Sequence, residues 1–376
     1  MKLIHLSDLH LGKRVNEYSM LEDQKFIIAQ ILDIIKEEQP DAVLLAGDIY
    51  DKAVPSAEAV CLFDAFLTEL SGMKHRIFVI SGNHDSAERI AFGSRLLDKN
   101  EIYLSPVYDG NPVSVSLYDV YGEAVVYLLP FVKPVHVRSC FPEETVESYT
   151  EAMRVAVNHM EVDRNKRNIL VTHQFVTGAS RCDSEDISVG GTDNVDASVF
   201  EPFDYVALGH LHGPQTVTRE TIRYCGTPLK YSFSEKNQVK SVTVVELEEK
   251  GKIQIRTVPL HPQHDLRELR GTYEELMNRR NYEGTAVDDY LRIVLTDEED
   301  IPDAVRRLGV IYPNIMKLEY DNKRTRSTAN LEEGIRMENR KPSEYFADFY
   351  KEQNGQAMSE TMEEIVSELF TMLGEN

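Results

Sequence analysis

Short apolar runs alternate with amphipathic stretches over the first hundred residues of the chain. The apolar runs contain many β-branched residues, which favour buried strands, and cover residues 2–7, 41–46 and 75–80. Between and after them, helical spacing and helix-start residues predict helices over 21–38, from Pro55-Ser56 to Ser71-Gly72, and over 86–97. This alternation predicts a layered α/β core whose first sheet is largely parallel.

The pattern changes in the middle of the chain. Residues 113–129 alternate apolar and polar positions around Tyr121-Gly122-Glu123, which predicts an antiparallel hairpin, and 143–160 is predicted to be a helix. Further short strands are expected without long helices between them, over 168–172, 204–208, 222–225, 239–246 and 253–258. A second sheet packed on the first, in a two-sheet sandwich flanked by helices, accounts for this change.

A smaller unit follows a break near His261-Pro262-Gln263. Residues 1–262 would form the main domain, and strand, helix and strand patterns over 263–320 predict a compact α+β capping domain. Residues 321–342 are polar and predict a linker. In the tail, 343–376, apolar residues step by four and three (Met358, Met362, Ile365, Leu369 and Met372), which predicts an amphipathic helix. Such a stripe is usually core, but in a self-contained tail a partner groove explains it better.

Composition narrows the class of protein. The net charge of −22 argues against a general nucleic-acid binder, although local basic patches or a partner can supply positive charge. The 4 cysteines are scattered without CxxC spacing, so we expect a reducing compartment and no structural zinc. The first residues are too polar for a signal peptide, and apolar runs fall short of the ~20 residues of a membrane span. We therefore expect an intracellular protein without a membrane partner.

Residue types that bind metals follow several of the predicted strands. They are Asp8, His10, Asp48, Asn83, His84, His173, His210 and His212. Alternate side chains of an extended chain point the same way. The two residues of an Asp-x-His or His-x-His pair can therefore bind one metal ion or two adjacent metal ions. Oxygen and imidazole ligands without thiolate suit Mn²⁺, Fe²⁺ or Zn²⁺. Any one histidine is more often a packed residue, but the joint occurrence at strand ends predicts a metal site.

These motifs resemble a known family. Asp8-x-His10, Gly47-Asp48-x-x-Asp51, Gly82-Asn83-His84-Asp85, Thr172-His173 and Gly209-His210-x-His212 look like the motif series of the calcineurin-like metallophosphoesterases. The segment from Gly47 to Ser56 is similar, more narrowly, to a branch of DNA-repair nucleases. The resemblance spans residues 8–212 with specific motifs and implies a metallophosphoesterase fold.

The resemblance implies two divalent ions, with manganese expected. Asp8, His10, Asp48 and His212 would hold one ion, and Asp48, Asn83, His173 and His210 the other, with Asp48 bridging. His84, positioned by Asp85, would then donate a proton to the leaving group or hydrogen-bond the scissile phosphate. For Asp51 and Asp85, turn-capping is an equally good interpretation.

The resemblance also implies partners. They are DNA, a coiled-coil ATPase that binds the helical tail, and a second copy of the chain within a heterotetramer. Dimer contacts would come from the helices over 56–71 and 86–97, whose apolar residues could equally be core. Lys13, Arg14, Arg89 and Arg181 could contact phosphates, although solvated surface charge is the simpler interpretation of each.

The implied activity is double-strand exonuclease and single-strand or hairpin endonuclease cleavage of DNA. Such an enzyme would act in DNA repair, replication and recombination, in the bacterial cytoplasm at the nucleoid. Two alternatives stay open: a small-molecule phosphodiesterase of the same superfamily, and a catalytically idle scaffold that docks the ATPase on DNA.

Overall fold

A computed structural model describes residues 1–111, 113–185 and 193–323, together with single residues 325, 346, 350, 358, 359, 362 and 366. Its first sheet has the strand order β16-β15-β1-β4-β5-β6. The strands span Ile253–Pro259, Ser241–Leu247, Lys2–Leu6, Ala42–Ala46, Arg76–Ile80 and Ile102–Leu104, respectively. The run from β1 to β6 is parallel, and β15 and β16 add an antiparallel edge. The predicted parallel core is therefore present.

The second sheet has the order β13-β14-β12-β9-β8-β7. Its strands span Gln215–Val217, Arg219–Tyr224, Tyr205–Gly209, Arg167–His173, Gly122–Leu129 and Val113–Asp119. The expected hairpin is β7–β8, and β8, β9, β12 and β14 are mutually parallel. Two small two-stranded sheets lie in the loops. One pairs β2 (Arg14–Val15) with β3 (Tyr18–Ser19), and the other pairs β10 (Phe175–Val176) with β11 (Asn194–Val195).

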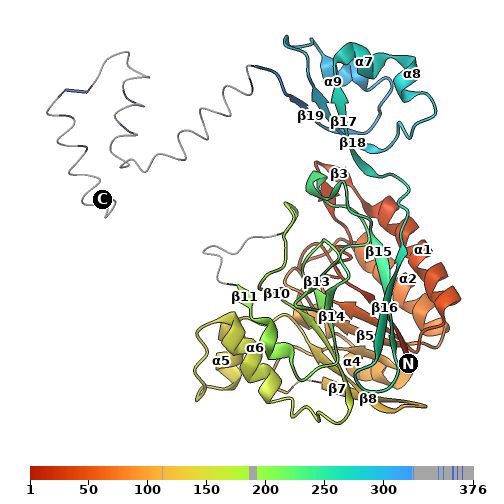
Figure 1. The fold of residues 1–376 in the computed structure, drawn as a ribbon, viewed down its shortest axis with the longest axis vertical. Helices are drawn as coiled ribbons and strands as arrows, with labels where there is room; N and C mark the ends of the chain where they lie inside the picture. Colours follow the sequence, from red (N-terminus) through yellow and green to blue (C-terminus); the bar gives the residue numbers. More distant parts are fainter. Residues whose placement is uncertain are drawn as a thin grey trace.

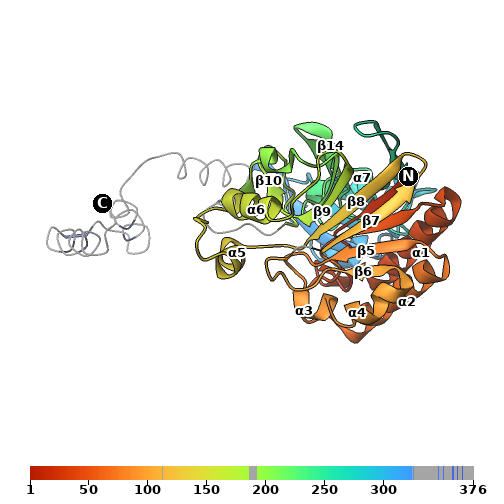
Figure 2. The same cartoon turned by 90° about the horizontal axis from the view of Figure 1, so that it is seen from below.

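The two sheets pack face to face, with helices outside, as Figure 2 shows. Leu44, Phe78, Val126 and Val171 lie in the buried layer between the sheets. Helices α1 (Leu21–Glu38) and α2 (Ala57–Gly72) cover the outer face of the first sheet, and α5 (Pro134–Cys140) and α6 (Tyr149–Asn158) cover the second. The predicted fold class, a helix-flanked two-sheet sandwich, is confirmed.

Three sequence-based expectations about elements need correction. The strands over 239–246 and 253–258 belong to the first sheet, because β15 is buried along nearly its whole length and fits between β1 and β16. The helix expected over 86–97 is two short helices, α3 (Ala87–Ile90) and α4 (Ser94–Leu97), separated where Gly93 adopts φ +77°. The helix expected over 143–160 begins at Tyr149, because Ser148 and Glu151 form a capping box there.

A separate small sheet follows the sandwich, and Figure 1 shows it at the top of the molecule. Its parallel strands are β17 (Leu266–Gly271), β18 (Tyr290–Leu295) and β19 (Ile315–Tyr320), of which β17 was not anticipated. Three helices belong to the same unit as this sheet: α7 (Tyr273–Met277), α8 (Arg279–Tyr282) and α9 (Ala304–Leu308). The 3-10 helices η1 (Asp98–Asn100), η2 (Ala197–Phe200) and η3 (Phe233–Glu235) lie in the sandwich. We call residues 263–320 the C-terminal module.

The buried carboxylate of Asp23, on α1, joins this module to the sandwich. It accepts hydrogen bonds from the Tyr290 hydroxyl at 2.7 Å and from the His264 imidazole at 2.9 Å. The predicted linker beyond residue 323 and the predicted helical tail lie outside the described residues, apart from the single residues given above. Among the helices that the structure describes, none has the length and apolar character to cross a bilayer.

Candidate metal centre

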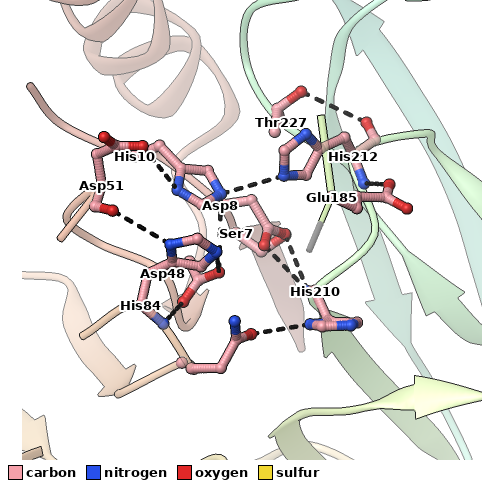
Figure 3. Close-up of polar contacts among 12 residues, drawn as sticks. Ser7, Asp8, His10, Asp48, Asp51, His84, Glu185, His210, His212 and Thr227 are labelled. Atoms are coloured by element: carbon pink, nitrogen blue, oxygen red, sulfur yellow. Dashed lines mark hydrogen bonds and ion pairs between the residues drawn. The ribbon is translucent and has the colours of Figure 1, made fainter. Parts of the chain in front are cut away.

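The carboxyl ends of strands from both sheets meet at one site. Asp8 and His10 follow β1, Asp48 follows β4, Asn83 and His84 follow β5, His173 ends β9, and His210 and His212 follow β12. Parallel strands expose their carboxyl ends at the same edge, where α/β proteins place their ligands. The structure therefore brings together every residue predicted to bind a metal, and Figure 3 shows most of them converging. We call this group the metal centre.

The backbone is held in an uncommon conformation at these positions. Asp8, His10 and Asp48 have φ of 54°, 44° and 49°, and His210 has φ of 108°. Left-handed backbone at residues other than glycine costs roughly 1–3 kcal/mol each and persists only where the surroundings impose it. Here the Asp8 amide donates to the Gly47 carbonyl and the His10 amide to the Asp48 carbonyl, both at 3.0 Å. These hydrogen bonds lock the loops after β1 and β4 together.

Two glycines allow the loops to approach one another. A Cβ atom on Gly82 would collide with the carboxylate of Asp48, and one on Gly209 would collide with the backbone carbonyl of Ala46. Gly209 thus lets β12 of the second sheet come close to β4 of the first. Without these glycines, the ligand-bearing loops of the two sheets could not converge.

One half of the centre is formed by His10 and His212. Their Nε2 atoms lie 3.1 Å apart, and the Nε2 of His10 lies 3.7 Å from Asp48 Oδ2. Asp8, His10 and His212 each offer a ligand atom within 4.8 Å of the others. This set supplies one carboxylate and two imidazoles.

The other half surrounds Asn83. Its Oδ1 lies 3.0 Å from His173 Nε2 and 2.9 Å from His210 Nδ1. His173 Nε2 also lies 3.3 Å from Asp48 Oδ2. Asp48 therefore stands between the two halves and contacts both.

These donors fit divalent cations. Two nitrogen ligands bound at ~2.0–2.1 Å to one ion stand about 3.0–3.4 Å apart, and the separation of the His10 and His212 nitrogens lies in that range. The buried His10 Nδ1 has no hydrogen-bond partner in the part of the chain that the structure describes. The buried carboxylates of Asp8 and Asp48 repel each other across the centre. A cation bound between them would offset this repulsion.

Burial and mutual charge shift the pKa values of this cluster strongly. Burial lowers the pKa of His10 well below its usual range, and burial and the neighbouring Asp48 raise the pKa of Asp8. Burial alone would raise the pKa of Asp48, but His173, His10 and His84 outweigh it and keep that carboxyl ionised. Burial opposes a charge on His173, yet Asp48 raises its pKa to about 9. Asp48 and His173 thus stabilise each other's charged form.

His84 lies at the centre, close to Asp48 and to the backbone carbonyl of Asp51. The Nδ1 of His84 lies 3.1 Å from the carbonyl oxygen of Asp51, and its Nε2 is 3.9 Å from Asp48 Oδ2. Asp85 accepts hydrogen bonds from the backbone amides of Ile49, Tyr50 and Gly82, at 2.9–3.0 Å. These contacts fit the turn-capping interpretation of Asp85, because its oxygens hold the loop after β4 against the turn after β5.

His84 also has a place among possible ligands. It groups with His10 and Asp48, each offering a ligand atom within 4.8 Å of the others. The geometry therefore allows a ligand role for His84 beside that of proton donor.

A buried polar network behind His212 escaped the sequence reasoning. His212 Nδ1 lies 2.6 Å from the Ser184 hydroxyl, which donates to Glu235 at 2.6 Å, and Lys240 donates to the other oxygen of Glu235 at 2.6 Å. Since the hydroxyl proton goes to Glu235, Ser184 accepts the Nδ1 proton of His212, leaving its Nε2 lone pair toward His10. Ser184 and Glu235 are 51 residues apart, so no local spacing could reveal the network.

The expected DNA-contacting residues are dispersed around the centre. Lys13 binds Asp51 at 2.8 Å, and Arg181 binds Asp193 at 3.0 Å while stacking on Phe175. Both therefore lie near the centre, already paired with carboxylates. Arg14 is exposed and contacts the carbonyl of Glu17, and Arg89 is exposed on α3.

Comparison with known proteins agrees with the geometry. Residues 1–214 match the calcineurin-like phosphoesterase family, and residues 262–354 match the type 5 capsule protein repressor C-terminal domain. A solved structure of a dimetal phosphatase from Danio rerio covers 70% of this chain and 98% of its own, at 11% identity. Its TM-score to this chain is 0.40.

Two curated relatives share most of the chain. The D subunit of nuclease SbcCD from Staphylococcus epidermidis is 33% identical, and the match covers 99% of both chains. The protein of the same name from Staphylococcus saprophyticus is 34% identical over 90% of this chain and 88% of its own. Together with the strand-end ligand cluster, these matches show that the chain belongs to the calcineurin-like phosphoesterases and, within them, to the family of the D subunits of nuclease SbcCD.

Proposed function

We propose that this protein hydrolyses DNA phosphodiester bonds as the nuclease subunit of a complex with an SbcC-type coiled-coil ATPase. The observation that carries the proposal is the convergence of Asp8, Asp48 and their imidazole neighbours from both sheets on one centre. The similarity to the D subunits supplies the substrate class. The activities expected are exonuclease cleavage of duplex ends and endonuclease cleavage of single strands and hairpins, in DNA repair, replication and recombination.

Two divalent ions, expected to be Mn²⁺, would be held by the two halves of the centre. Asp8, His10, Asp48 and His212 would hold the first, and Asp48, Asn83, His173 and His210 the second. When bound, such ions polarise a phosphodiester, ionise a water molecule and neutralise the leaving oxygen.

The chain's own residues would orient the reaction. The His84 imidazole donates its Nδ1 proton to the Asp51 carbonyl, so only Nε2 can serve the substrate. Nε2 faces the centre, 3.9 Å from Asp48 Oδ2, where it can give a proton to the leaving oxygen. The network of Ser184, Glu235 and Lys240 fixes the tautomer of His212, and the loops after β4 and β5 are held together by Asp85.

A cleavage assay tests the proposal. End-labelled duplex and hairpin DNA are incubated with the protein in Mn²⁺, in Mg²⁺ or with a chelator, with and without the ATPase and ATP. We expect cleavage in Mn²⁺, little in Mg²⁺, and none with chelator or in the Asp48→Asn variant. Hydrolysis of bis-p-nitrophenyl phosphate without any attack on DNA would instead assign a small-molecule phosphodiesterase.

The ligand set also opposes the alternative of an idle scaffold. Every residue that the family resemblance assigns to the ions is present and gathered at one place. Isothermal titration of the metal-free protein should therefore find two Mn²⁺ per chain. Absence of any Mn²⁺ binding would favour the scaffold and overturn the two-metal assignment.

A homodimer is supported by an apolar surface patch. Val54, Val60, Phe92 and Leu96 are 71%, 44%, 85% and 74% exposed, and they lie on or beside α2 and the turn between α3 and α4. Exposed large apolar side chains mark protein interfaces where they form one surface. The partner proposed for this patch is a second copy of the chain, as the family resemblance implies.

The ATPase would bind the tail after Pro342. The apolar stripe of the tail is a feature of the sequence, and apart from Met358 and Met362 it lies outside the described residues. A variant ending at residue 342 should retain Mn²⁺-dependent hydrolysis and lose co-purification with the ATPase. Co-purification at the full-length level would contradict this docking proposal.

A further inference from the structure

A cavity of about 670 Å³ opens beside the metal centre. Asn83 and Asp85, in the turn after β5, line it on the side of the centre, and Tyr108, Phe131 and His136 line its other walls. This volume lies within the range of small-molecule sites. A group attached to a phosphate at Asn83 would therefore find space in this cavity, which we call the side pocket.

An aromatic wall stands between the side pocket and the ligands. The ring of Phe131 meets the imidazole of His173 edge to face, with ring centroids 6.2 Å apart. The amide of Phe131 donates to the carbonyl of Ser81 at 3.0 Å, which fixes this wall to the turn after β5. A flat group that enters the side pocket can therefore stack on a ring whose place is set by the metal centre itself.

The side pocket also offers unfilled hydrogen-bonding capacity. The Tyr108 hydroxyl is buried and has no hydrogen-bond partner among the described residues. Such a group costs free energy until a partner reaches it. The imidazole of His136 and the hydroxyl of Ser139 line the same pocket from α5. Both already have a partner, since His136 Nδ1 accepts from the Lys133 amide and the Ser139 hydroxyl donates to the Val135 carbonyl. A ligand with a hydrogen-bonding edge would satisfy the Tyr108 hydroxyl.

Charge distinguishes between the parts of a nucleotide. Two carboxylates, Asp85 and Glu88, and one ammonium group, Lys133, line the side pocket, so a second phosphate placed beside the two carboxylates would be repelled by them. A neutral, flat group with polar edges meets no such penalty. The base of the nucleotide next to the cleaved bond has this chemistry, and one nucleotide's length keeps it near the metals.

We propose that the side pocket receives the base of the nucleotide that flanks the scissile phosphate, stacked on Phe131 and hydrogen-bonded to Tyr108. This inference rests on the proposed nuclease function and deepens it. A base in the side pocket is unstacked from its neighbours, so cleavage favours nucleotides that are already unpaired, at frayed ends or in hairpin loops.

Paired oligonucleotides test the proposal. Both are single strands with one cleavable bond, and one carries an abasic nucleotide beside it. We expect the wild-type KM for the abasic strand to be about tenfold higher, in line with base–aromatic stacking. Phe131→Leu, which keeps apolar volume without a ring, should bring this ratio to about one, and Phe131→Tyr should retain it.

Tyr118→Leu is the matched control, because Tyr118 is a 71% exposed ring on β7 of the second sheet and does not line the side pocket. Equal thermal midpoints of the variants would exclude misfolding. Equal KM values for the two strands in the wild type, or an unchanged ratio in Phe131→Leu, would overturn the proposal.

A binding measurement separates this inference from the proposed function. If the wild type cleaves neither strand, the nuclease proposal fails, and titration with dAMP and with 2-deoxyribose 5-phosphate in Mn²⁺ still tests the pocket. About tenfold tighter binding of dAMP, lost in Phe131→Leu, supports the base site. Equal affinities for the two compounds refute it.

Discussion

At the scale of single residues, the metal centre combines strained backbone with buried charge. Asp8, His10 and Asp48 all have left-handed backbone, and each has a pKa displaced by burial and by its neighbours. Such conformations and charges are unfavourable individually and are maintained by the surrounding hydrogen bonds. Residues that orient the ligands should therefore matter almost as much as the ligands.

The first prediction concerns His84. The His84→Gln variant lacks the only group proposed to protonate the leaving oxygen. Its kcat on duplex DNA should therefore fall by about 10²–10⁴-fold. Mn²⁺ stoichiometry, measured by titration calorimetry, should stay at the wild-type value if His84 is a donor and not a ligand. His261→Gln, at an exposed histidine beyond the sandwich, is the control. Undiminished cleavage would remove His84 from the mechanism.

The second prediction concerns Glu235, which holds Ser184 and through it His212. Burial raises the pKa of this carboxyl, but His212 and Lys240 outweigh burial and keep it ionised. In Glu235→Gln, the His212 tautomer is less firmly set, and the Mn²⁺ Kd should rise about 10–100-fold. Glu201→Gln, at an exposed carboxylate paired with Arg164, is the matched control. The same Kd in both variants would show that the network is merely structural.

At the scale of elements, the ends of strands position the metal centre, and the ends of short helices decide which apolar side chains are exposed. The turn at Gly93 divides what the sequence pattern predicts as one helix, and it leaves Phe92 exposed. This break creates the apolar patch proposed as the dimer interface. A continuous helix would have placed Phe92 on a regular helical face.

The third prediction tests that patch. Phe92→Glu puts a charge at the most exposed of the four apolar side chains proposed for the interface, and loss of a hot-spot residue costs about 2 kcal/mol or more. We expect the dimer Kd to rise by about 30-fold or more in analytical ultracentrifugation. Val120→Glu, in the 93% exposed turn after β7, is the control and should leave the assembly unchanged. A wild-type monomer at all concentrations would refute the interface.

Local sequence patterns predicted which helices and strands exist better than they predicted where these elements begin and end and which strands pair. The run over 21–38 matches α1 residue for residue, because helical periodicity and Pro40 define both its ends. The start of α6 was missed because the Ser148 capping box competes with the apolar pattern before it. The return of β15 to the first sheet depends on contacts far along the chain, which no local pattern contains. For the same reason Ser184 and Glu235 could not be found beside His212.

At the scale of the whole molecule, distant segments join the two sheets at both ends of the sandwich. The metal centre lies at one end. Away from it, Asp119 at the end of β7 binds Arg167 of β9 through two contacts of 2.6 and 3.0 Å and the chain's amino terminus at 2.9 Å. Because the amino terminus leads directly into β1, this cluster joins the first sheet to the second.

The fourth prediction follows from the charge of Asp119. Burial opposes its ionisation, but Arg167 and the terminal amine lower its pKa well below the usual value. A depressed pKa in the folded state adds stability that is complete above the unfolded pKa of about 3.9 and is lost as pH falls toward the folded value. Asp119→Asn should therefore lower the free energy of unfolding by about 1.5–3 kcal/mol at pH 7 and by less at pH 3.

Urea denaturation at the two pH values measures this difference. Asp33→Asn, at a 71% exposed carboxylate paired with Lys36, is the matched control and should change stability little at either pH. A loss in Asp119→Asn that is equal at both pH values would show that its charge contributes nothing.

The metal centre takes its residues from β1 and β4 of one sheet and from β9 and β12 of the other. This arrangement also has a consequence for the amount of folded protein in the cell. Ions that bind only the folded chain favour folding by mass action, so the supply of metal would govern the amount of intact protein as well as its activity. Scarcity of the metal would then lower the abundance of the protein through proteolysis of the unfolded chain.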